Sequence, residues 1–208
     1  ICVRLVGSEM CIRDRLPIDT YKKDVDEITQ VGLSHDWESL RSSIISNGLR
    51  HSTLSAQMPS ESSSIVSNAT NGIEPPRDYL SIKKSKKGPL KQIVPSYNTL
   101  KNNYTLLWDM KSNDGYIKVV SVMQKFFDQA ISGNWSYNPK NYEDNEVPIS
   151  VMAQDLLTTY KYGWKTSYYQ NTYDMKSDEP DDVEEVKPQL EKLFTELSEE
   201  VECDSCTI

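Results

Sequence analysis

The chain has 208 residues, of which 37% are hydrophobic and 26% charged, enough for one domain with a sizeable core. The mean hydropathy is −0.60 and no apolar run approaches the roughly 18 residues of a membrane span, which excludes a membrane-embedded protein. The net charge of −8 argues against nucleic acid as the main partner.

Charge is unevenly distributed along the chain. From Asp174 to the end there are 13 acidic and 3 basic residues. Blocks of like charge are typical of solvated, mobile segments. The sequence therefore predicts a near-neutral folded body, residues 16–173, followed by a flexible acidic tail, residues 174–208.

The four cysteines lie near the two ends, at Cys2, Cys11, Cys203 and Cys206. This spacing is not a disulfide framework and suits a reducing compartment, so we expect a cytoplasmic protein.

In chain order, the first predicted helix begins after Asp36, a good N-cap, and stops at Asn47-Gly48. Leu54, Ala56 and Met58 alternate with polar residues and predict a strand that Pro59 ends. A serine-rich turn follows and leads into a helix at Ile65–Ala69. Strand, hydroxyl-rich turn and helix start therefore follow one another.

Two strands, Tyr79–Lys83 and Gln92–Tyr97, are predicted across a basic loop that reads as a charged hairpin tip. Three helices with apolar residues spaced three and four apart come next. The first carries the apolar residues Leu100, Tyr104, Leu107 and Trp108. The second starts at Asn113 or Asp114, carries Val119 to Ile131 and ends at Gly133. The third has Pro148 in its first turn, carries Met152, Leu156 and Tyr160 and ends at Gly163. A final strand, Trp164–Thr172, and a short tail helix around Leu190–Val201 complete the expectation.

Cys203-Asp204-Ser205-Cys206 is a C-x-x-C pair that can close a disulfide and exchange electrons with other dithiols. Neighbouring acids should raise the thiol pKa values, which favours a shuttle over a strong oxidant. Half of a zinc site, completed by Cys2, Cys11, His35 or His51, and no role at all remain alternatives.

Two further segments have a functional and a purely structural interpretation. Ser60, Glu61, Ser62 and Ser63 sit where a strand hands over to a helix and can bind phosphate, or can form a simple capping turn. Tyr168 and Tyr169 lie in the last predicted strand, where packing is the ordinary role. Stacking of their rings would require a departure from regular pleating, because neighbours on a strand point to opposite faces.

Five strings together resemble the C-terminal part of the large, catalytic subunit of class I ribonucleotide reductases. They are Leu16–Lys23 (LPIDTYKK), Pro59–Ser64 (PSESSS), Ser67–Arg77 (SNATNGIEPPR), Asn113–Tyr116 (NDGY) and Tyr168–Thr172 (YYQNT).

The resemblance implies an α/β fold, the C-terminal portion of a ten-stranded α/β barrel, left incomplete here. It implies reduction of ribonucleoside diphosphates to 2′-deoxy products by a thiyl radical. Ser60 to Ser63 would hold the substrate phosphates, and Tyr168 and Tyr169 would relay the radical from a metal-containing small subunit. Cys203 and Cys206 would re-reduce the active site and be reduced by thioredoxin or glutaredoxin. The complete large subunit would be a homodimer, and the small subunit's C-terminal peptide would dock on the helices within residues 99–132 and 148–162.

Other parts of the family pattern are missing. The radical cysteine, the two active-site redox cysteines and the effector-binding region lie upstream in the family, and Cys2 and Cys11 do not match them. Residues 1–15 resemble translated adapter sequence, so we expect a non-native leader. We therefore expect a truncated fragment, without a cofactor or metal of its own, that is inert alone and prone to aggregate.

Two alternatives remain open. In the first, only Cys203 and Cys206 act, as a thiol carrier; such a pair would be expected near the start of a βαβ unit. In the second, the chain is a non-catalytic phosphate-binding domain, which leaves the tail cysteines without a purpose.

Overall fold

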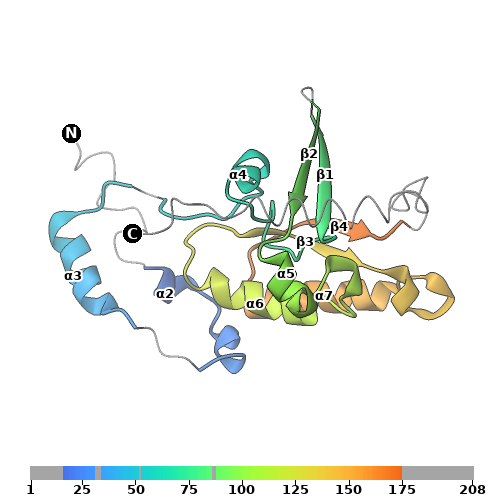
Figure 1. Cartoon of the computed structure of the whole chain (residues 1–208). Helices are drawn as coiled ribbons and strands as arrows, with labels where there is room; N and C mark the ends of the chain where they lie inside the picture. Colours follow the sequence, from blue (N-terminus) through green and yellow to red (C-terminus); the bar gives the residue numbers. More distant parts are fainter. Residues whose placement is uncertain (1–15, 31–33, 52, 86–87, 175–208) are drawn as a thin grey trace.

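A computed structural model describes residues 16–30, 34–51, 53–85 and 88–174. In the described residues, helices come first along the chain, and the strands form two separate two-stranded sheets (Figure 1). The helices are α2 (Pro17–Thr20), α3 (Trp37–Asn47), α4 (Glu61–Val66), α5 (Tyr97–Leu100), α6 (Asp114–Gln124) and α7 (Ile149–Tyr162). The strands are β1 (Leu80–Ser85), β2 (Gly88–Ile93), β3 (Ser132–Tyr137) and β4 (Thr166–Thr172). Short 3-10 helices cover Lys23–Glu27, Lys101–Asn103, Leu107–Asp109, Pro139–Asn141 and Glu143–Asn145.

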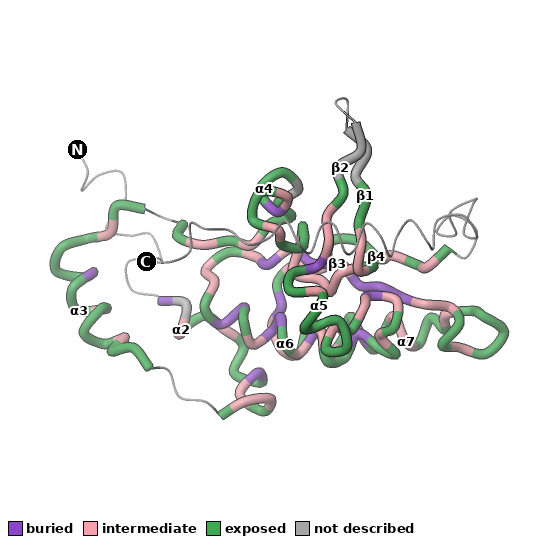
Figure 2. Tube along the Cα trace, viewed as in Figure 1, coloured by how far each residue is buried: buried purple, intermediate pink, exposed green. Residues whose placement is uncertain are grey.

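The core is a βαβ unit in which β3 and β4 pair in parallel and α7 connects them. Parallel strands need such a crossover, and α7 packs along α6 beneath them (Figure 1). Buried residues concentrate on β3 and on the inner sides of the two helices (Figure 2). The buried cluster consists of Ile117, Val120, Ile131, Trp135, Tyr137 and Trp164.

The strand predicted at 54–58 is reduced to one bridge. Gln57 pairs in parallel with Ile131, and its carbonyl accepts a hydrogen bond from the Ser132 N–H at 2.9 Å. The prediction of a half-buried strand was wrong in extent, since Leu54 and Met58 are both more than half exposed. Within the described residues, segment 54–58 pairs only with the chain at the outer edge of β3, and no second strand lies on its other side.

The hairpin predicted around the basic loop is confirmed, with shifted ends. β1 and β2 pair antiparallel from Leu80 opposite Ile93 to Ser85 opposite Gly88. The hairpin projects away from the two long helices (Figure 1).

The helix predicted after Asp36 is also confirmed. The Asp36 carboxylate accepts from the Ser39 N–H at 2.9 Å, and Gly48 ends α3 at φ 77°. α3 lies at one end of the molecule (Figure 1), and Arg41 ties it to Asp19 through an ion pair of 2.7 Å.

The first of the three predicted apolar helices is wrong. Its segment contains only α5 and two 3-10 turns, with Tyr104 in an extended conformation between them. Tertiary hydrogen bonds replace the helical ones: the Tyr104 hydroxyl donates to the Pro95 carbonyl and the Leu107 N–H to the Pro76 carbonyl. Leu107 is buried as a result, whereas Leu100 remains exposed.

The second predicted helix is confirmed as α6 but ends at Gln124, not at Gly133, and β3 was not predicted. The buried Gln124 side chain ends the helix. Its amide donates to the carbonyls of Phe127 and Gln129, and its oxygen accepts from the Ile131 N–H. Gly133 instead lies inside β3, where an added Cβ would come within 2.8 Å of Trp164.

The third predicted helix is confirmed as α7, which Gly163 ends at φ 79°; Pro148 is its N-cap residue and not part of its first turn. The orientation is unexpected. Asp155 and Thr159 are buried, while Leu156 and Tyr160, which the spacing predicts to face the core, are exposed. The final strand is confirmed as β4.

The described residues form a mixed α/β structure without a closed barrel, and none of their helices is long and apolar enough to cross a membrane. The predicted leader, the tail helix and both cysteine pairs lie outside the described residues.

Candidate functional site

Tyr168 and Tyr169 lie in a β-bulge. Gly133 of β3 faces Ser167 of β4, and Trp135 faces Gln170, so the single residue Asn134 lies opposite both tyrosines. An extra residue on one strand bends it and breaks the alternation of side chains. The two rings therefore meet, with centroids 4.3 Å apart and planes at 63°. The predicted departure from regular pleating is present, but the rings meet edge to face and are not stacked.

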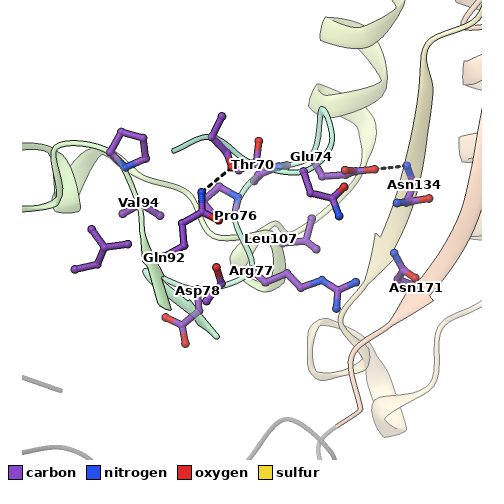
Figure 3. Close-up of a pocket in the computed structure, with 16 residues that line it drawn as sticks. Thr70, Glu74, Pro76, Arg77, Asp78, Gln92, Val94, Leu107, Asn134 and Asn171 are labelled. Atoms are coloured by element: carbon purple, nitrogen blue, oxygen red, sulfur yellow. Dashed lines mark hydrogen bonds between the residues drawn. The ribbon is translucent and has the colours of Figure 1, made fainter. Parts of the chain in front are cut away.

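The bulge is held by Asn134. Its side-chain oxygen accepts a hydrogen bond from the Tyr169 N–H at 3.0 Å. On the other side, the Asn134 N–H donates to the Glu74 carboxylate at 2.7 Å, and Figure 3 shows Glu74 reaching toward Asn134. A three-residue chain of contacts thus runs from Glu74 through Asn134 to the tyrosine pair.

Both tyrosine side chains are accessible, at 57% for Tyr168 and 59% for Tyr169. A hydrogen bond with the Tyr168 side chain, followed by its charge and by partial desolvation, raises the pKa of Tyr169. At neutral pH the Tyr169 phenol therefore carries its proton. Exposed and in ring contact, the pair is suited to exchanging electrons and protons with a partner outside this part of the chain.

A cavity of about 360 Å³ lies beside this strand pair. Its walls come from the segment 69–78, from the hairpin and from β3 and β4 (Figure 3). Arg77 extends across it in the direction of Asn171 in the same view. The polar residues that line the cavity are Thr70, Asn71, Glu74, Arg77, Asp78, Ser81, Gln92, Asn134 and Asn171.

The serine-rich segment lies inside α4 (Glu61–Val66) and not in a turn before it, so the prediction of a helix at Ile65–Ala69 was wrong in its bounds. The Ser60 side chain does not cap the helix, and its N–H donates to the Asn71 carbonyl at 2.7 Å. Ser62 and Ser63 are exposed, while Ser64 is buried. Because Asn71 also lines the cavity, this segment connects to the same region as β4.

Two predictions remain, the tail thiol pair and the alternative of a metal site. Cys203 and Cys206 lie outside the described residues. Within those residues, no three His, Cys, Asp or Glu side chains cluster as metal ligands, and His35 packs edge-on against Trp37.

Sequence reasoning missed Glu74 and Asn134. Glu74 lies inside the family-like string SNATNGIEPPR without a predicted role, and Asn134 follows Gly133, where the sequence predicts the end of a helix. Their contact joins residues 60 positions apart, and no local spacing reveals it.

Large apolar side chains are exposed on both α6 and α7, and we call these two sets of residues the apolar face. Its residues recur at three- and four-residue intervals, as on one side of a helix. They are Val119, Met123 and Phe126 along α6 and just after it, and Ile149, Leu156, Leu157 and Tyr160 on α7.

Comparison with known proteins gives one consistent family. Residues 8–170 match the family model described as "Ribonucleotide reductase, barrel domain", a range that starts inside the predicted leader. The chain is 62% identical to the ribonucleoside-diphosphate reductase subunit alpha of Haemophilus influenzae over 82% of its length. It is 59% and 58% identical to the ribonucleoside-diphosphate reductase 1 subunit alpha of Salmonella typhimurium and Escherichia coli, each over 81%. In all three cases it spans 22% of the relative. The chain belongs to the ribonucleotide reductase barrel-domain family.

Proposed function

We propose that this chain is part of a ribonucleoside-diphosphate reductase large subunit, which reduces ribonucleoside diphosphates to their 2′-deoxy products by thiyl-radical chemistry. Support comes from the family match and from relatives that carry this name. The observation that carries the proposal is the bulge in β4, which keeps two accessible tyrosine rings in contact at the cost of regular pairing. A purely packing role gives no reason for that arrangement.

In this proposal Tyr168 and Tyr169 relay the radical. A phenol can lose a proton and an electron together, and contact between two rings provides a short path for both. The radical would arrive from a metal-containing small subunit and pass on toward a cysteine outside this chain. The chain itself needs no cofactor for this step.

Ser60, Glu61, Ser62 and Ser63 would hold the substrate phosphates. Exposed hydroxyls at the start of α4 support this role, because N–H groups there lack helical partners and hydroxyls can donate to anions. Cys203 and Cys206 would return the active site to its dithiol state and be reduced in turn by thioredoxin or glutaredoxin. This thiol chemistry favours the cytoplasm, where such reductants keep cysteines reduced.

The small subunit would dock on the apolar face of α6 and α7. An amphipathic or extended peptide buries such a face readily, and exposed patches of this kind mark interaction sites. The same proposal places β3 and β4 among the last strands of a ten-stranded barrel, within a large subunit that forms a homodimer and binds nucleotide effectors in another region.

The relay is tested in a chimera, in which residues 16–208 of this chain replace the matching segment of the Haemophilus influenzae alpha subunit and the residues after it. With the small subunit present, Tyr169→Phe should abolish nucleotide reduction, because phenylalanine has no phenolic proton to release. Tyr173→Phe is the matched control: this ring packs on Trp108, at 5.3 Å, and should be dispensable. Full activity of the Tyr169→Phe chimera would reject the relay.

The thiol role has a separate test in the same chimera. Cys203→Ser with Cys206→Ser should stop repeated turnover with thioredoxin but allow a single turnover. A phosphate-binding domain without catalysis predicts no turnover from any variant.

A further inference from the structure

Regular β-structure would separate the two tyrosine rings, because consecutive side chains on a strand point to opposite faces. Their contact at 4.3 Å therefore depends on the bulge, which places two residues of β4 opposite one residue of β3. The residue opposite them is Asn134. Whether the rings meet therefore depends on the hydrogen bonds that fix Asn134 and the extra residue of β4.

Asn134 makes hydrogen bonds on both sides of β3. The Tyr169 N–H, which loses its place in the ladder at the bulge, donates to the Asn134 side-chain oxygen at 3.0 Å. A side-chain acceptor thus does what a backbone carbonyl does in a regular pair.

Asn134 is itself fixed from the opposite edge of β3. Ser132 donates its N–H to the Gln57 carbonyl, and Asn134, two residues on, presents its N–H to the same side. No backbone continues the Gln57 pairing there in the described structure, and the Glu74 carboxylate accepts this N–H at 2.7 Å. Glu74 also lines the cavity beside β3 (Figure 3).

We propose that Asn134, oriented by Glu74, is a positioning residue that holds Tyr168 and Tyr169 in ring contact for radical transfer. The use of the pair rests on the proposed function; the positioning does not. Without the Asn134 acceptor, the bulged register loses a hydrogen bond, so its equilibrium constant relative to other registers should fall about fivefold. The population with the rings in contact falls by at most this factor, and the rate of transfer falls with it.

The test uses the chimera with 3-fluorotyrosine at position 169 and two variants of equal size. Asn134→Asp keeps an oxygen that accepts from the Tyr169 N–H, whereas Asn134→Leu does not. Contact with Tyr168 raises the pKa of Tyr169, so the fluorine NMR titration reports whether the rings still meet. Asn134→Leu should lower this pKa toward that of a Tyr168→Phe variant and slow turnover by up to about fivefold, while Asn134→Asp, whose own charge also raises the pKa, should keep the pKa raised and the turnover unchanged.

The two proposals fail separately. An unchanged titration in Asn134→Leu overturns the positioning role, whatever the turnover. An active Tyr169→Phe chimera overturns the relay but leaves the titration result standing. Should Asn134→Leu not fold, Glu74→Leu paired with Glu74→Gln repeats the comparison one contact further away, and equal titration curves for that pair would overturn the inference.

Discussion

The hydroxyl of Tyr137 donates a hydrogen bond of 3.0 Å to the carboxylate of Asp155, which joins the end of β3 to the middle of α7 inside the core. The same carboxylate oxygen accepts from the Asn113 side-chain amide, whose own oxygen accepts from the Ser136 N–H. Burial, with the neighbouring Asp155 charge, raises the pKa of Tyr137 above its ordinary value. This network explains why α7 turns a polar side inward.

Replacing Asp155 by leucine should therefore destabilise the chain, although it makes the buried side of α7 more apolar. Two buried donors, on Asn113 and Tyr137, would lose their acceptor, at a cost of about 2–4 kcal/mol in the free energy of unfolding. Tyr137→Phe removes one of these bonds and should cost about 1–2 kcal/mol. Urea denaturation followed by tryptophan fluorescence measures both, and a stabilised Asp155→Leu variant would refute the network's role.

Gly133 is predicted to tolerate no side chain. An added methyl group would press on the Tyr116 hydroxyl, on Trp164 at 2.8 Å and on Ile73 at 3.2 Å, so Gly133→Ala should cost about 1–3 kcal/mol. Gly115→Ala is the matched control, because Gly115 is exposed in α6 with no atom near the new methyl. It should change stability by less than about 1 kcal/mol, toward greater stability. Equal melting temperatures for the two variants would contradict this packing.

Asp128 should make stability sensitive to acid. Desolvation by itself raises the pKa of Asp128, but N–H donors from Leu54 and Ser55, at 2.9 and 2.7 Å, outweigh it and leave the pKa lowered. A lowered folded-state pKa stabilises the protein above the unfolded value of about 3.9, and this contribution is lost as the pH falls through the folded value. Unfolding measured from pH 7 down to about pH 2 should thus show a flatter acid limb in Asp128→Asn than in the unaltered chain. Parallel curves would disprove the assignment.

The outward face of α7 should serve binding and contribute little to folding. Leu157→Lys with Tyr160→Lys should weaken capture of the small subunit by the chimera at least tenfold, since each truncated anchor costs on the order of 1–2 kcal/mol. The unfolding free energy should change by less than about 1 kcal/mol, because both side chains are mostly exposed and the contact that Tyr160 loses, with the Lys22 ammonium 4.0 Å from its ring centroid, lies at the surface. Thr158→Lys, on the same helix but outside this face, controls for added charge. Unchanged capture by the double variant would remove this face from the interface.

The sequence predicts well the elements whose ends carry their own signals. α3 has its Asp36 cap and Gly48 stop, α7 has Gly163, and the hairpin has a charged tip between alternating residues. The sequence predicts secondary structure poorly where hydrogen bonds to distant residues determine the backbone conformation. The segment after α5 carries helical spacing, yet contacts to Pro76 and Pro95 draw it into turns.

The sequence likewise predicts some residues of the candidate site and misses others. Tyr168, Tyr169 and the serine-rich segment stand out in the sequence, although the strand predicted before the serines is a single bridge and the serines lie inside α4. The supports of the site do not stand out, because Asn134 acts through a backbone N–H 35 residues away and Glu74 reaches across 60. Such contacts arise from the pairing of β3 with β4, which composition and periodicity do not encode.

The bulge in β4 also changes what a deletion would mean. Removing one residue from most strands shifts every later side chain to the wrong face. Between Ser167 and Gln170, removing one tyrosine would instead leave one residue opposite Asn134 and restore an uninterrupted ladder. The shortened strand would pair more regularly but would lose the ring contact on which the proposed relay depends, so selection for stability alone would favour loss of the second tyrosine.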